Sequence, residues 1–143
     1  MAILGSRVVY DRKLMSIMPI FESISGIALK DCLMDLNNEL VFIVDEENIG
    51  RAIGRNGSTA SRISAALNRK IKILAFSPDI REFVRNAIHP VRPKQIDDND
   101  GVITISAEDA KSRGLLIGRN SRNLKNTEQL IRRFFSIKGI KVK

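Results

Sequence analysis

Residues 49–63 read IGRAIGRNGSTASRI, with the tetrapeptide Gly54-Arg55-Asn56-Gly57 at their centre. Two glycines that bracket two polar residues allow the backbone to turn with φ > 0 and to approach a ligand closely, because no Cβ intervenes. Ala60, Ile63 and Leu67 follow at helical spacing, which predicts that the loop leads directly into a helix. The unpaired N–H groups and the positive dipole end of such a helix suit an anion, most often a phosphate.

The same pattern recurs in the second half of the chain. Residues 50–56 read GRAIGRN and residues 114–120 read GLLIGRN, so position 50 matches position 114. An internal repeat of this kind predicts two copies of one folding unit. In the second copy Ser121 stands where the first copy has Gly57, and a Cβ at a position that needs positive φ predicts a weakened loop.

The composition is typical of a soluble globular protein with two small domains. The chain has 143 residues, of which 43% are apolar and 28% charged; at these proportions a core can form and disorder is not expected. Its one cysteine, Cys32, excludes an internal disulfide and a cysteine-based zinc site, which favours a reducing cytoplasm. Charged residues interrupt the apolar stretches near the start of the chain, so we expect neither a signal peptide nor a membrane span.

The net charge of +8 is unevenly distributed. Residues 51–72 contain six lysines and arginines and no acid, and residues 114–143 contain eight and one acid, Glu128. These two stretches together carry +13, so the remainder of the chain carries −5. Because each basic stretch includes a glycine loop, the pattern favours binding of a polyanion over a merely solvated charged face.

Apolar periodicity predicts the elements of the first copy, residues 12–76, after a lead of residues 1–11. Asn37-Asn38 suits a tight turn between its first two strands, and the second of these strands is apolar on both faces, as a central strand would be. The expected order is a helix at 14–24, strands at 29–36 and 40–44, a short helix from 45 to the loop, a helix to 68 and a strand at 70–76.

The second copy, residues 77–143, is expected to repeat this order. Ser77 suits the cap of its first helix, with Pro78 at the first helical position, and Pro93 predicts an edge strand. Very few residues separate the two copies, so we expect them to pack as one rigid body. The expected elements are a helix ending at His89-Pro90, strands at 91–96, 102–105 and 140–142, a turn at 97–101, a capping box of Ser106 with Asp109, and a long helix that includes Leu124, Thr127, Ile131, Phe134 and Phe135.

Ile53-Gly54-Arg55-Asn56-Gly57, followed by Ala60 and Ile63, resembles the I-G-x-x-G core of a KH domain. The second copy matches this core with Ile117-Gly118-Arg119-Asn120 and departs from it at Ser121. An order that opens with a helix and closes on a strand is that of the type II form. The resemblance therefore implies an α+β fold of two tandem type II KH domains, each α-β-β-α-α-β, with a three-stranded sheet and helices on one face.

Two adjoining type II KH units over residues 12–143 resemble the archaeal NusA family of transcription factors. The resemblance implies a protein of transcription termination or antitermination that binds single-stranded RNA and is not an enzyme, with no cofactor and no metal. It also raises RNA polymerase or the transcription complex as a partner, although this sequence shows no counterpart of the bacterial factor's polymerase-binding domain. The alternative is a general KH-type RNA-binding protein of the ribosome or of RNA metabolism.

A KH domain uses its GXXG loop to clamp the backbone of four nucleotides. Arg55 and Asn56 at the loop tip are expected to meet phosphate oxygens, while Ile53 and Ile63 fit either an apolar groove for the bases or the ordinary core. The resemblance implies as RNA-binding residues Ile53, Gly54, Arg55, Asn56, Gly57, Ser58, Arg62 and Ile63 in the first copy, and Gly118, Arg119, Asn120, Ser121, Arg122 and Lys125 in the second.

A nucleotide-dependent enzyme is the rival function, because GRAIGRNG resembles a dinucleotide-binding loop. However, G-x-G-x-x-G and a Walker GK(S/T) are both absent, and two antiparallel strands are expected before the loop, where a parallel βαβ unit is needed. His89 fits a helix end, and Cys32 a buried strand, better than a catalytic centre. The acidic turn of Asp97, Asp98 and Asp100 suits a metal, but a solvated hairpin accounts for it better.

Overall fold

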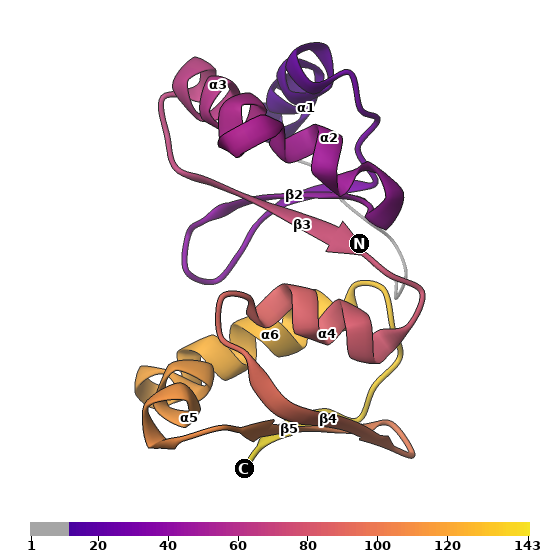
Figure 1. Cartoon of the computed structure of the whole chain (residues 1–143), viewed down its shortest axis with the longest axis vertical. Coiled ribbons are helices and arrows are strands. Elements are labelled where there is room, and N and C mark those ends of the chain that lie inside the picture. The colour runs from indigo at the N-terminus through magenta and orange to yellow at the C-terminus, as the bar shows by residue number, and fades with distance from the viewer. Residues whose placement is uncertain (1–11) are drawn as a thin grey trace. The chain divides into compact units, whose positions relative to one another are not determined.

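The computed structural model describes residues 12–143, and the expected lead of residues 1–11 lies outside that range. The chain divides into two compact units at the boundary between Phe76 and Ser77. Each unit has the element order α-β-β-α-α-β (Figure 1). The expected α+β fold with two three-stranded sheets is therefore confirmed. No helix within residues 12–143 combines the length and the hydropathy that crossing a bilayer requires.

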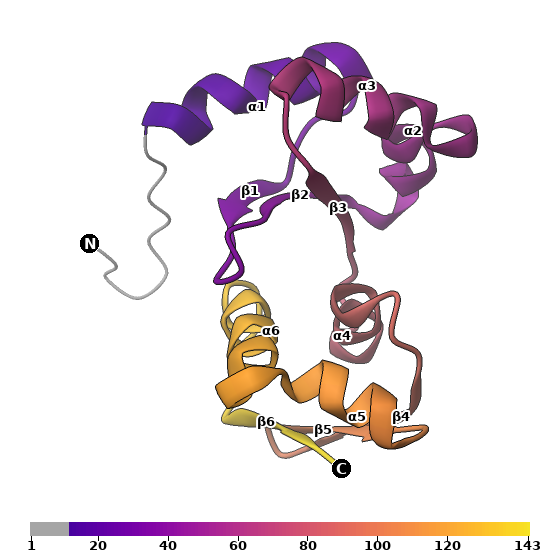
Figure 2. The same cartoon turned by 90° about the vertical axis from the view of Figure 1, so that its left-hand side faces the viewer.

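In unit 1 the central strand is β2 (Leu40–Asp45), which pairs antiparallel with β1 (Asp31–Met34) and parallel with β3 (Ile71–Phe76). Every residue of β2 except the last is buried, as its apolar sequence predicts for a central strand. Three helices lie together on one face of the sheet (Figure 2). They are α1 (Arg12–Ser25), α2 (Ile49–Ile53) and α3 (Ser58–Leu67).

The core of unit 1 forms where α1 and α3 meet the sheet. Leu14, Ile17 and Phe21 recur at helical spacing on α1, and all three are buried. The Phe21 ring stacks on the Phe42 ring of β2, with 4.5 Å between the ring centroids. Ile63 of α3 is fully buried in the same cluster, so apolar contacts anchor the helix that follows the glycine loop.

The first strand is shorter than its sequence predicts. A strand is expected over residues 29–36, but β1 ends at Met34. The Asp35 side chain accepts hydrogen bonds from the backbone N–H groups of Asn37 (2.9 Å) and Glu39 (2.8 Å), so the turn begins at Asp35. Asn38 has a positive φ of 60°, which confirms the expected tight turn.

In unit 2 the central strand is β5 (Val102–Ala107), which pairs antiparallel with β4 (Pro93–Asn99) and parallel with β6 (Gly139–Val142). Pro93 opens the edge strand β4, which confirms its expected position. Helices again cover one face of the sheet (Figure 1). They are α4 (Ile80–Ile88), α5 (Ala110–Ile117) and α6 (Arg122–Arg132).

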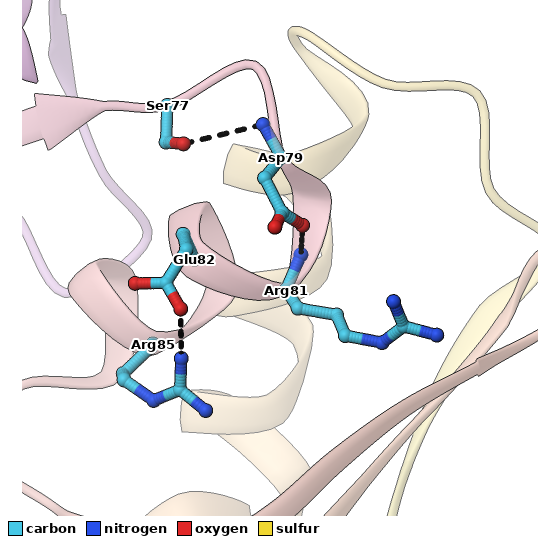
Figure 3. Close-up of polar contacts among 5 residues, drawn as sticks. All are labelled: Ser77, Asp79, Arg81, Glu82 and Arg85. Carbon is cyan, nitrogen blue, oxygen red and sulfur yellow. Dashed lines mark hydrogen bonds and ion pairs between the residues drawn. The ribbon is translucent and has the colours of Figure 1, made fainter.

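The start of α4 differs from the expected one. Asp79 caps the helix by accepting from the backbone N–H of Arg81 (3.0 Å), and Oγ of the buried Ser77 accepts from the N–H of Asp79 (3.2 Å) (Figure 3). Ser77 is therefore not the cap, and Pro78 lies before the helix. Serine and aspartate both suit an N-cap, so only the path of the backbone decides between them.

Two other boundaries in unit 2 also differ. β4 continues to Asn99, so the turn that was expected from residue 97 is confined to Asp100 and Gly101. The Asp109 side chain caps α5 by accepting from the N–H of Ser112 (2.7 Å), whereas Ser106 lies inside β5. The expected capping box is therefore wrong in its first member.

The C-terminal end of α6 lies before the two phenylalanines that were expected within it. The helix ends at Arg132, and Phe134 and Phe135 follow in a turn. Both rings contact Phe83 of α4, with centroid distances of 5.3 Å and 5.7 Å. Apolar packing between α4 and the end of α6 thus holds the second unit together.

Candidate nucleic-acid interface

The first glycine loop connects α2 to α3. Gly54 has φ 81° and ψ 169°, and Asn56 and Gly57 follow in the left-handed conformation, with φ 53° and 73°. The N–H of Gly57 donates to the carbonyl of Gly54 (3.1 Å) and closes the turn. A Cβ on Gly54 would lie 2.4 Å from Oγ1 of Thr59 and 2.7 Å from its backbone nitrogen. The loop therefore requires glycine at its first position.

The second loop, between α5 and α6, repeats this backbone closely. Gly118 has φ 73° and ψ 173°, and Asn120 and Ser121 follow in the left-handed conformation, with φ 55° and 61°. Serine keeps this conformation at a cost of about 1–2 kcal/mol. A Cβ at the matching Gly57 would meet no atom within 4 Å. Replacing the second glycine by serine therefore does not change the shape of the loop.

The helices that follow the two loops, α3 and α6, start without a side-chain cap, unlike α4 and α5 of unit 2. Neither Gly57 nor Ser121 makes a side-chain cap hydrogen bond, and neither α3 nor α6 has an acid in its first turn. In contrast, Asp79 and Asp109 cap α4 and α5. The nearest side chains thus leave the positive ends of α3 and α6 without a negative charge, an arrangement that favours an external anion.

The structure places most of the sequence-predicted residues on the surface around the loops. Ile53, at the end of α2, is 37% exposed, whereas Ile63 has no exposed surface. Ile63 therefore supports α3 from the core and is left out of the contact surface. The exposed polar and charged candidates are Arg55, Asn56, Ser58 and Arg62 in unit 1, and Arg119, Asn120, Arg122 and Lys125 in unit 2.

Two exposed residues beside the loops were missing from the sequence-based candidates. Arg51 on α2 and Leu115 on α5 occupy matching positions of the repeat, and Leu115 is 53% exposed. Arg51 precedes Arg55 by four positions in the sequence. The repeat was the sequence signal that could have identified Arg51 and Leu115 as candidates. They make the two loop surroundings chemically different.

Two arginines that contribute to the basic stretches form hydrogen bonds within the fold. Nη2 of Arg69 donates to the carbonyl of Asn38 in the β1–β2 turn (3.2 Å). Arg132 donates from Nη1 to the carboxylate of Glu128 (2.7 Å) and from Nη2 to the carbonyl of Lys138 (3.0 Å). Their guanidinium groups are therefore part of the scaffold, and the net charge overstates the surface available to a polyanion.

The acidic hairpin of unit 2 is held by its own contacts. Asp98 accepts from the N–H of Gly101 (3.1 Å), and Asp100 pairs with Nζ of Lys138 (3.2 Å). In the part of the chain that the structure describes, no group of three or more metal-ligating side chains occurs. Asp98 and Asp100 thus make their contacts within the turn and with Lys138.

The strands around the first loop bear on the dinucleotide alternative. The two strands before the loop, β1 and β2, are antiparallel as expected, whereas β2 and β3, which the loop connects, are parallel. Gly54 nevertheless follows the helix α2 rather than a strand. A dinucleotide fingerprint runs from a strand directly into a helix, and this order does not match it.

The chain resembles known proteins over most of its length. No protein-family model matches the chain. The probable transcription termination protein NusA of Methanocaldococcus jannaschii is 32% identical over 129 residues, which cover 85% of this chain and 68% of that protein. The chain belongs to the archaeal NusA family.

Other NusA proteins match over most of their length. The Halobacterium salinarum protein is 28% identical over 125 residues, covering 86% of this chain and 89% of the relative. The Thermoplasma acidophilum protein is 26% identical over 144 residues, covering 96% and 97%. The crystal structure of APE1850 aligns with a TM-score of 0.70 at 25% identity, over 94% of this chain and 100% of the other. The NusA resemblance seen in the repeated glycine loop is therefore confirmed.

Proposed function

We propose that this NusA-family protein binds single-stranded RNA and acts in transcription termination or antitermination. Its relatives are described as probable transcription termination proteins. The observation that carries the RNA proposal is the loop Gly54–Gly57, in which left-handed residues lead into a helix whose start no side chain caps. Such a corner accommodates a phosphate of the nucleic-acid backbone.

The loop tip would hold the phosphates. Arg55 and Asn56 are both exposed there, between the two glycines. A guanidinium presents a planar fork of donors that matches phosphate oxygens, and the amide of asparagine adds a neutral donor. Contacts of this kind set the position of an RNA strand but do not distinguish its bases.

The bases would lie beside the loop on an apolar surface. Ile53 supplies exposed apolar area at the end of α2, and α2 packs against β3, an edge strand of its sheet. Base edges would therefore face the backbone of β3. Only 5% of the residues are aromatic, so recognition would depend on this surface more than on stacking platforms.

RNA polymerase or another component of the transcription complex is the proposed second partner, on the basis of the family. A general RNA-binding role in the ribosome or in RNA metabolism is the alternative and would use the same loops. Crosslinking of the protein to cellular RNA distinguishes the two roles. Termination or antitermination requires crosslinks on nascent transcripts, whereas the alternative requires them on ribosomal or mature RNA.

Titration of labelled single-stranded RNA at several salt concentrations tests the binding itself. Log affinity should fall with log salt by about 0.7 for each phosphate that the protein neutralises on a single strand. A duplex of the same sequence is the control, because the proposed surface needs splayed, unpaired bases. Equal binding of the duplex, or a flat response to salt, contradicts the proposal.

A further inference from the structure

We propose that the second glycine loop, which lacks the second glycine, is the main electrostatic anchor for the phosphate backbone of the RNA. This inference rests on the proposed RNA-binding function and deepens it by assigning the salt-dependent part of the affinity to unit 2. A search based only on an intact G-x-x-G would favour the first loop instead. The charge and the geometry of the two matching segments point the other way.

The repeat aligns segment 45–62 with segment 109–126, and each contains the helix before a loop, the loop and the first five residues of the helix after it. Segment 45–62 has three acids and three bases, for a net charge of zero. Segment 109–126 has one acid and five bases, for a net charge of +4. Long-range attraction of a polyanion follows this local charge. All five bases of the second segment are exposed: Lys111, Arg113, Arg119, Arg122 and Lys125.

Three charges of this difference lie before the loops, where residues 45–47 (DEE) align with residues 109–111 (DAK). After the loops, unit 2 gains two cations and lacks the counterpart of Arg62, which aligns with Asn126. Ser58 and Ser61 of α3 correspond to Arg122 and Lys125 of α6. Residues three apart are neighbours on a helix surface, so both cations lie on one side of the first turns of α6. The helix dipole disfavours cations at this end, and α6 has no acid in its first turn to offset it. A bound phosphate backbone would place negative charge beside these cations.

The next acid on α6 does not neutralise this surface. Glu128 Oε1 accepts from Nη1 of Arg132 (2.7 Å), and its Oε2 accepts from the backbone N–H of Ile140 in β6 (3.0 Å). Its carboxylate therefore binds Arg132 and the start of β6. Arg119, Arg122 and Lys125 are exposed around the start of α6.

The backbone of the second loop can follow a phosphate chain as the first loop can. Ser121 has φ 61° and ψ 23°, against 73° and 17° for Gly57. In both loops the N–H at this position donates to the carbonyl of the first glycine, at 3.2 Å and 3.1 Å. The Cβ of a residue at this position points into open space in unit 1. A serine hydroxyl there adds a donor instead of closing the site.

Measurement of the salt dependence of RNA binding by the full chain tests the inference, using fluorescence anisotropy and a labelled single-stranded RNA. The double variant Arg122→Ser/Lys125→Ser gives α6 the residues of α3. It should reduce the slope of log affinity against log salt by about 1.4, which corresponds to two phosphates. Lys141→Ser/Lys143→Ser removes the same charge from an exposed part of unit 2 and should leave the slope unchanged.

A third pair, Arg55→Ser/Arg62→Ser, removes two exposed cations around the first loop and should reduce the slope less. The inference is overturned if the unit 2 loop variant keeps the parent slope, or if the unit 1 variant loses more. Lys125→Ser alone, with an expected reduction of about 0.7, replaces the double variant should that one fail to fold. Failure of the parent protein to bind RNA at all would instead contradict the proposed function.

Discussion

A Cβ on Gly54 would lie 2.4 Å from Oγ1 of Thr59, at the start of the following helix. A Cβ on Gly57, three residues later, would meet no heavy atom within 4 Å. Gly54 also has φ 81° and ψ 169°, a region of backbone conformation that is essentially restricted to glycine. The first glycine is therefore required by packing and conformation together, and the second by conformation alone.

We therefore expect Gly54→Ala to lower the free energy of unfolding by about 2–4 kcal/mol, since strain and the clash with Thr59 add. Gly57→Ala, the matched control, should cost only about 1–2 kcal/mol, because alanine can occupy the left-handed conformation there. Chemical denaturation of both variants and of the parent measures the difference. Equal losses would show that the contact with Thr59 relaxes freely.

Replacing Arg55 and Asn56 together by aspartate should weaken RNA binding and leave the fold intact. Both side chains are exposed, so the free energy of unfolding should change by no more than about 1 kcal/mol. The first loop loses its part of the affinity because two carboxylates now face the phosphates. Lys13→Asp/Ser16→Asp on the exposed face of α1 changes the net charge equally and should affect binding much less. Parent-like affinity of the loop variant in the anisotropy titration would show that the clamp is misassigned.

Ser121→Gly should stabilise unit 2 by up to about 1 kcal/mol. Glycine relieves the left-handed strain of serine but gains entropy in the unfolded chain, so the two effects partly cancel. Ser121→Val is the informative contrast, because a β-branched residue strongly resists φ > 0. It should destabilise the unit and weaken RNA binding, whereas Ser121→Gly should leave the affinity nearly unchanged. Thermal unfolding and RNA titration of both variants check this, and a valine variant that behaves like the parent would contradict it.

Asp109 should make the start of α5 sensitive to acid. The hydrogen bond from the backbone N–H of Ser112, followed by that from its side chain, lowers the pKa of Asp109 below its ordinary value of 3.8. Desolvation opposes this shift, and the nearby charge of Lys111 adds to it. Because the pKa is lowered in the folded state, the ionised cap contributes its full stabilisation at pH values above the ordinary pKa of 3.8. This contribution is lost as the pH falls through the lower, folded-state pKa.

The pKa of the Asp109 carboxyl can be followed by NMR through an acid titration. Asp109→Asn is the control, because asparagine caps a helix without titrating, so this part of the pH dependence of stability should disappear. A carboxyl that titrates at or above 3.8 would contradict the capped geometry.

Local sequence signals were sufficient for the order of elements in both units. The apolar run of β2, the tight turn at Asn38 and the edge position of Pro93 each depend on residues a few positions apart, and such patterns can be recognised directly. The repeat then related the two loops and predicted the tandem fold. Local signals failed where several residues suited the same role, as with Ser77 and Asp79 before α4.

The chemistry of the candidate site depended on contacts that the sequence does not contain. Ile63 and Ile53 look equivalent in sequence, yet one is buried by α1 and the sheet and the other is exposed. Arg69 reads as part of a basic stretch, but its guanidinium holds the turn at Asn38, 31 positions away. Ser121 reads as a broken motif, and the flanking helices of unit 2 nevertheless hold it in the conformation of Gly57. Burial, long-range hydrogen bonds and tolerated backbone strain are set by residues that are distant in the chain and adjacent only after folding, so the tertiary structure alone decides them.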